Sequence, residues 1–133
     1  MAGEESYPDD LKYHAEHDWA RIEGDEAVLG ITWWAQDALG ELVHYEAPAV
    51  GGSTVKDETY GEVESVKAVS DVIAPLSGEI LEVNEKASEE PESINDDPYG
   101  EGWLVDLQID AASLEDGFAG LLDADGYRTT VAE

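Results

Sequence analysis

The sequence contains no cysteine, one phenylalanine, one methionine and only six lysine and arginine residues among its 133 positions. Without cysteine, neither a disulfide framework nor a thiol nucleophile is available. No run of residues approaches the roughly 20 apolar positions of a membrane-spanning helix. Residues 1–10 lack the apolar stretch that a signal peptide needs. The composition therefore predicts a soluble, cytoplasmic protein with no membrane partner.

Acidic residues are present in large excess. The 33 aspartates and glutamates, set against six basic residues, give a formal net charge of −27. The acids are spread from end to end, and the hydrophobic share of 42% is normal for a globular protein. A surface of this charge repels nucleic acid and anionic membranes, which excludes both as partners. The pattern is typical of a halophilic protein, because in molar salt a Debye length of about 3 Å screens self-repulsion.

The chain is long enough for one domain with a modest core. Residues 1–10 are expected to form a flexible acidic leader, and residues 11–133 a single domain that is monomeric. The pattern of apolar residues predicts a mainly β fold. Strands are predicted over 11–14, 19–23, 27–31, 41–46, 59–66, 69–74, 79–83 and 103–109.

Short helices are predicted at the margins of this β domain. Thr32 can cap a helix that ends at Leu39, with Gly40 as its stop. Ser113 can cap a second short helix, and the residues from Asp123 can add further helical turns. Residues 48–53 are expected to form a loop, and residues 84–102 a long connector.

Lys67 is one of four lysines and lies between two predicted strands. Gly78 follows it by eleven residues, where the next strand begins. This spacing predicts an amine displayed at the tip of a hairpin, where it can serve as a covalent handle. The alternative is an ordinary solvated lysine.

Two other segments match known metal-binding motifs only in part. The segment His14-Ala15-Glu16-His17 lacks the His-Glu-x-x-His order of a zinc protease. The segment Asp123-Ala124-Asp125-Gly126 matches only part of a calcium loop. No dedicated metal site is therefore expected.

Several segments together resemble a known family, the H proteins of the glycine cleavage system. The resemblance covers residues 11–127. It is carried by His17-Asp18-Trp19, Gly30-Ile31-Thr32, Val63-Glu64-Ser65-Val66-Lys67-Ala68, Pro75-Leu76-Ser77-Gly78-Glu79 and the run from Asn95 to Trp103. It implies a flattened barrel–sandwich hybrid of the lipoyl/biotinyl type, with short peripheral helices and a C-terminal helix. It also implies that Lys67 carries lipoate in amide linkage.

The same resemblance implies a non-catalytic carrier that works with four partner enzymes. Glycine decarboxylase (P protein) loads an aminomethyl group onto the lipoyl arm, and aminomethyltransferase (T protein) removes the one-carbon unit. Dihydrolipoyl dehydrogenase (L protein) reoxidises the arm, and a lipoate-attaching enzyme installs it. The hard chemistry then belongs to the cofactors and partners.

Individual site residues also follow from the resemblance. It implies that a groove for the loaded arm uses Asp18 and Asp71, whose carboxylates would favour the cationic amine. Asp18 stands where the family usually has glutamate, and the nearby Glu16 can compensate for the shorter side chain. Glu64 and Gly78 are implied as recognition features for the lipoate-attaching enzyme. The alternatives are that the acids are surface residues and that Gly78 is required by a turn with positive φ.

Two other functions remain open on the sequence. A biotin carrier uses the same architecture, but that family places methionine beside the modified lysine, where this chain has Val66 and Ala68. An unmodified paralogue could serve only to pass lipoate to other complexes.

Overall fold

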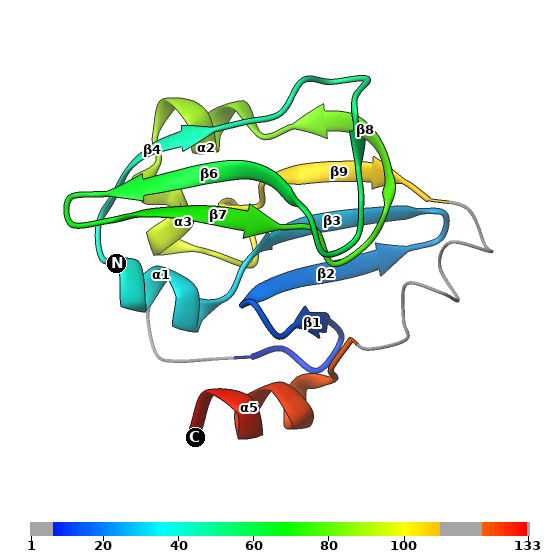
Figure 1. Ribbon diagram of the computed structural model, residues 1–133, viewed down its shortest axis with the longest axis horizontal. Helices are drawn as coiled ribbons and strands as arrows, with labels where there is room; N and C mark the ends of the chain where they lie inside the picture. Colours follow the sequence, from blue (N-terminus) through cyan, green and yellow to red (C-terminus); the bar gives the residue numbers. More distant parts are fainter. Residues whose placement is uncertain (1–6, 110–120, 133) are drawn as a thin grey trace.

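The computed structural model describes residues 7–109 and 121–132. The strands of the described chain form two antiparallel β-sheets (Figure 1). The larger sheet has six strands in the order β1-β2-β3-β9-β8-β5. Its strands are β1 (Lys12–His14), β2 (Asp18–Glu23), β3 (Glu26–Ile31), β5 (Ser53–Thr54), β8 (Gly78–Val83) and β9 (Val105–Gln108).

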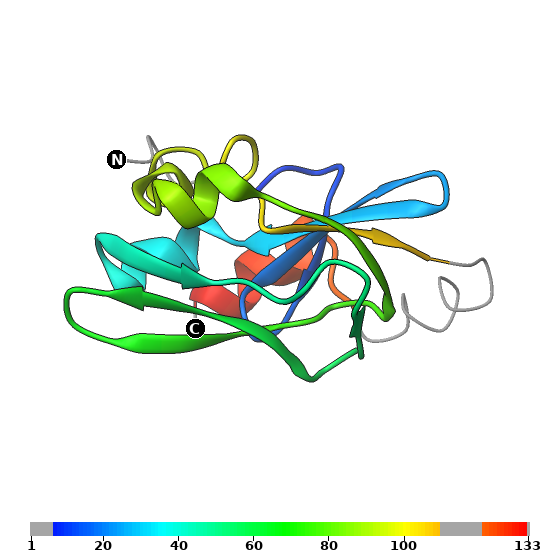
Figure 2. The same cartoon turned by 90° about the horizontal axis from the view of Figure 1, so that it is seen from above.

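The smaller sheet forms a second layer over the first (Figure 2). Its three strands, in the order β4-β6-β7, are β4 (Leu42–Glu46), β6 (Thr59–Ser65) and β7 (Val69–Ile73). One core cluster joins side chains of both sheets, including Leu29 and Leu107 from the larger and Val63 and Val72 from the smaller. This arrangement confirms the predicted barrel–sandwich hybrid.

The alternation of apolar and polar residues along the sequence correctly predicts which face of a strand is buried. In β9, Val105 and Leu107 are fully buried whereas Gln108 is exposed. Leu107 lies opposite Ala27 of β3 and Ile80 of β8, so it packs at the centre of the larger sheet. A strand with one buried face needs this period of two.

The helix α1 (Trp33–Leu39) begins and ends at the predicted residues. The Thr32 hydroxyl accepts a hydrogen bond from the Ala35 N–H at 3.2 Å, as an N-cap residue does. At the other end Gly40 has φ 83°, a conformation that favours glycine. Among the described residues, no helix is long and apolar enough to cross a membrane.

The prediction that residues 84–102 form only a long connector was wrong, because this segment contains two short helices. They are α2 (Glu85–Glu89), which Asn84 caps, and α3 (Glu92–Asp96). A five-residue helix is too short to show a helical period in its sequence, and it depends on tertiary packing for stability. Ala87 of α2 and Ile94 of α3 provide that packing, because both side chains lie in the core. The expected loop 48–53 likewise ends in the first residue of β5. The helix predicted from Ser113 falls mainly on residues 110–120, outside the described residues.

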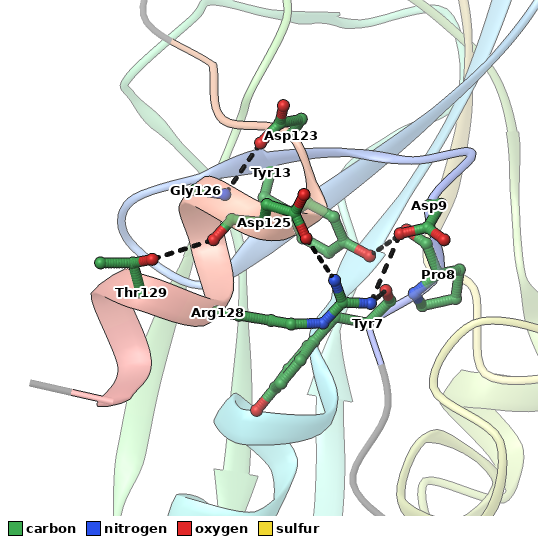
Figure 3. A network of polar contacts seen from close by, with 9 residues as sticks. All are labelled: Tyr7, Pro8, Asp9, Tyr13, Asp123, Asp125, Gly126, Arg128 and Thr129. Carbon is green, nitrogen blue, oxygen red and sulfur yellow. Dashed lines mark hydrogen bonds and ion pairs between the residues drawn. The ribbon is translucent and has the colours of Figure 1, made fainter.

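The two ends of the described chain are held together (Figure 3). Arg128, on the C-terminal helix α5 (Ala124–Ala132), donates to the Tyr7 carbonyl at 2.9 Å and pairs with Asp125. The Tyr13 hydroxyl donates to the Pro8 carbonyl at 2.6 Å. Tyr7 is only 6% exposed and packs in a core cluster with Tyr13 and Tyr127.

Candidate functional site

Lys67 lies at the tip of the β6–β7 hairpin. The Ser65 N–H donates to the Ala68 carbonyl at 2.8 Å, which closes a turn with Val66 and Lys67 at its centre. The side chain of Lys67 is exposed, and its neighbours Val66 and Val69 are 72% and 59% exposed. The structure thus places Lys67 where the sequence predicts it, at the tip of a hairpin. Figures 1 and 2 show the turn between β6 and β7 at the projecting end of the smaller sheet.

A buried serine fixes the backbone of this turn. The Ser65 hydroxyl oxygen accepts hydrogen bonds from the Lys67 N–H at 3.2 Å and the Ala68 N–H at 3.1 Å. Ser65 is only 4% exposed, so water does not readily compete for these bonds. Sequence reasoning placed Ser65 in a strand and missed this function. A serine immediately before a two-residue turn is the signal that could have found it.

The hairpin tip is also attached to the corner between α1 and β4. The Val66 N–H donates to the Glu41 carbonyl at 3.3 Å. A Cβ atom placed on Gly40 would lie 3.6 Å from Lys67 Cε and 3.9 Å from Nζ. The end of the Lys67 side chain therefore lies beside Gly40, where an added Cβ atom would make ordinary van der Waals contact with it.

Glu64 and Asp71 lie on the outer face of the same hairpin. Glu64 is opposite His44 of β4 and Val69 of β7. Asp71 is opposite Glu62, and directly opposed residues in antiparallel strands project to the same face. Glu64 and Asp71 are both exposed, so this hairpin presents both carboxylates to solvent.

Asp18 does not share this surface. Its side chain is 2% exposed, and its carboxylate accepts a hydrogen bond from the Ile73 N–H at 3.3 Å. Burial raises the pKa of Asp18 well above its usual range, although the Ile73 hydrogen bond acts in the opposite direction. The carboxyl thus ties β2 to the end of β7, so the alternative that Asp18 is a surface acid was wrong, and its part in a groove for the loaded arm stays a prediction.

Replacing Asp18 with asparagine should flatten the pH dependence of stability. Because the folded pKa is raised, the native protein keeps a proton that the unfolded chain releases, so wild-type stability falls as pH rises above about 4. The Asp18→Asn variant lacks this loss. Urea unfolding at a series of pH values in constant salt measures the two slopes.

The exposed Asp37→Asn variant is the matched control for that comparison, since it removes a carboxyl on α1 that is not buried and belongs to no cross-strand pair of acids. It should keep the wild-type slope. Parallel pH profiles for wild type and Asp18→Asn would contradict the explanation.

Glu16 and His17 lie in the turn between β1 and β2, and His14 is the last residue of β1. Glu16 is exposed, and its N–H donates to His14 Nδ1 at 3.0 Å. His14 Nε2 is 2.6 Å from Asp57, whereas His17 Nδ1 is hydrogen-bonded to the Tyr127 hydroxyl at 2.8 Å and stacks on Trp34. Burial lowers the pKa of His17. Within 7–109 and 121–132, no group of three or more His, Cys, Asp or Glu residues is arranged to hold a metal ion.

Gly78 lies away from the hairpin tip, at the start of β8 beyond the far end of β7. A Cβ atom on Gly78 would be 2.6 Å from the Gln108 carbonyl oxygen and 3.2 Å from Leu107 Cβ. Its φ is outside the left-handed region, so the suggested positive-φ turn was wrong. The close approach of β8 to β9 explains why glycine is required there.

With this geometry in place, comparison with known proteins is decisive. The family model described as "Glycine cleavage H-protein" matches residues 11–133. The chain belongs to this family. A glycine cleavage system H protein of Mycobacterium tuberculosis (strain ATCC 25177 / H37Ra) is 49% identical over 130 residues, covering 95% of this chain and 97% of its own length.

Two further relatives agree with this membership. The protein of the same name from Mycobacterium sp. (strain KMS) is 50% identical over 127 residues, covering 95% of this chain and 97% of its own. The crystal structure of a glycine cleavage system H protein from Mycobacterium marinum superposes with a TM-score of 0.83 at 40% identity, covering 96% of this chain and all of that one. Sequence and fold therefore point to the same family.

Proposed function

We propose that this chain is the lipoyl carrier of a glycine cleavage system and that lipoate is attached to Lys67. The observation that carries the proposal is an exposed lysine on a turn whose N–H groups are held by a buried serine. Family membership supports the carrier role, and the geometry of the turn supports Lys67 as the attachment point. The same membership favours lipoate over biotin as the group attached.

The residues at the tip fit an amide-linked arm. The deprotonated Lys67 amine attacks the carbonyl carbon of a lipoyl group activated by the attaching enzyme. The C–N bond forms as the bond to the activating group breaks, that group leaves with the electron pair, and the protons of the former ammonium pass to solvent. The amide product is neutral, which moves the formal net charge from −27 to −28. The neutral linkage needs no counter-ion, and the end of the Lys67 side chain lies beside Gly40. When bound, the lipoyl group supplies a sulfur atom that accepts the aminomethyl group and a dithiol that can be reoxidised.

The surface around Lys67 suits a cationic cargo. Glu64 and Asp71 are exposed on the face that adjoins the tip, and an amine near such carboxylates retains its proton. Glu16 is exposed and remains a candidate for the same purpose. Asp18 contributes indirectly in this proposal, by fixing the end of β7 through Ile73.

The proposed partners follow from the carrier role. Glycine decarboxylase and aminomethyltransferase would load and unload the arm, and dihydrolipoyl dehydrogenase would reoxidise it. A separate lipoate-attaching enzyme would read the hairpin, with Glu64 as a contact beside the lysine. The chain itself supplies presentation and protection rather than catalysis.

Intact mass spectrometry of the protein purified from its own host tests the proposal. We expect an increase over the sequence mass equal to one lipoyl group, and peptide mapping should place it on Lys67. No increase would support the unmodified paralogue, and a lipoyl group on Lys56 or Lys86 would overturn the assignment.

A further inference from the structure

We infer that Asn95 is a positioning residue that sets how Lys67 is presented, by clamping the corner between α1 and β4 on which the hairpin tip rests. The inference deepens the proposed function and rests on Lys67 being the attachment site. It concerns a side chain on α3, which is remote in sequence from both the corner and the hairpin.

Asn95 is buried and uses its whole amide. It is 1% exposed. Its Nδ2 atom donates to Gln36 Oε1 at 3.0 Å and to the Gly40 carbonyl at 2.8 Å, and its Oδ1 atom accepts from the Leu42 N–H at 2.8 Å. These bonds join α3 to the end of α1 and the start of β4, and they fix the orientation of the amide.

The two backbone bonds enclose Glu41. Asn95 binds the residue before it and the residue after it, Gly40 and Leu42, so the peptide groups on both sides of Glu41 are immobilised. The Glu41 carbonyl is the group that accepts the Val66 N–H from the hairpin. A continuous path of hydrogen bonds therefore runs from Asn95 through Glu41 to the residue preceding Lys67.

The same corner touches the lysine directly. Gly40, whose carbonyl Asn95 binds, lies under the Lys67 stem, and a Cβ atom added to this glycine would be only 3.6 Å from Lys67 Cε. A shift of the corner would thus move both the backbone support of the tip and the surface along which the stem lies. The clamp makes one orientation of the tip dominant before any enzyme binds.

Only an amide of this length satisfies the site. Aspartate would place a carboxylate oxygen against the Gly40 carbonyl, and neither group can donate a hydrogen bond. It would also bury a negative charge. Alanine leaves the Leu42 N–H and the Gly40 carbonyl without their partner. Asn95→Ala is therefore the variant that releases the corner.

The chain offers a closely matched control in Asn84. Its Nδ2 atom also donates to two backbone carbonyls, those of Glu101 and Trp103, and its Oδ1 atom also accepts from a backbone N–H, that of Lys86. Asn84 is 7% exposed, so the two asparagines are comparably buried. Asn84→Ala removes the same kinds of bond at a place that does not touch the corner.

The first measurement is amide hydrogen exchange of the unmodified wild type and both variants under identical native conditions. Opening the clamp should accelerate exchange of the Val66 amide by roughly tenfold in Asn95→Ala relative to Asn84→Ala. The second is steady-state lipoylation by a lipoate-attaching enzyme. We expect a roughly tenfold higher KM for Asn95→Ala, because the competent orientation is less populated, with kcat little changed.

The outcomes separate the inference from the proposed function. Equal exchange at Val66 and equal KM in the two alanine variants, with a wild type that is lipoylated on Lys67, would overturn the inference alone. A wild type that takes no lipoate on Lys67 would overturn the proposed function and the inference with it. Asn95→Ser is measured in parallel, so that a poorly folded alanine variant does not prevent a decision.

Discussion

The Lys67→Arg variant should lose all lipoylation and all exchange of glycine's carboxyl carbon with bicarbonate in a reconstituted system. Arginine keeps the positive charge and a similar stem, but its guanidinium stays protonated and does not form the amide. The tip is exposed, and its backbone bonds are made by Ser65, so the fold should be unchanged. Lipoylation is followed by intact mass and exchange by incorporation of labelled bicarbonate.

Lys86→Arg is the control for this experiment. Lys86 is an exposed lysine paired with Glu101 at 2.9 Å, and arginine can keep that pair. It should be lipoylated and active at wild-type levels. Full exchange activity in Lys67→Arg would show that the hairpin amine is not the carrier group.

The melting temperature should rise by roughly 5–15 °C when sodium chloride is raised from 0.01 M to 1 M. Over this range the Debye length falls from about 30 Å to about 3 Å, so repulsion between surface charges is screened. Acidic residues oppose each other directly across strands: Glu46 and Glu62, Glu62 and Asp71, Glu23 and Glu26, Glu82 and Asp106. Each like-charge pair is unfavourable by roughly 0.2–1 kcal/mol. Screening them relieves a cost of about 1–4 kcal/mol.

Glu62→Gln provides the internal comparison, because Glu62 belongs to two of these pairs. Its melting temperature should be higher than that of the wild type in dilute buffer and should rise less with salt. Sucrose at matched osmolality controls for preferential exclusion, since it stabilises without screening charge. A wild-type melting temperature that does not change with salt would contradict the proposed adaptation to high salt.

Much of the β architecture was predictable because its signals are local. The alternation of Val105 and Leu107 with the polar Asp106 and Gln108 identifies a half-buried strand. Thr32 and Gly40 mark the two ends of α1, because threonine is favoured at a helix N-cap and glycine at the positive φ that ends a helix. Lys67 at a hairpin tip follows from the two strands that flank it.

Other features depend on contacts between distant segments, which a single sequence does not display. Asp18 reads as one more acid in an acidic chain, yet its carboxyl is buried against Ile73, 55 positions away. Gly78 is required by the Gln108 carbonyl, which approaches it from another strand. Asn95 matched the family pattern, but its clamp on Gly40 is visible only once α3 is placed against α1.

The antiparallel bridge between Tyr13 and Leu122 has a consequence for how copies of this chain behave at high concentration. β1 is the outermost strand of the larger sheet, and Tyr13 exchanges two backbone hydrogen bonds of 2.8 Å with Leu122. Unoccupied outer strands recruit foreign strands and initiate aggregation. The segment leading into α5 occupies part of that outer edge, which leaves it less open to pairing with a strand from a second copy.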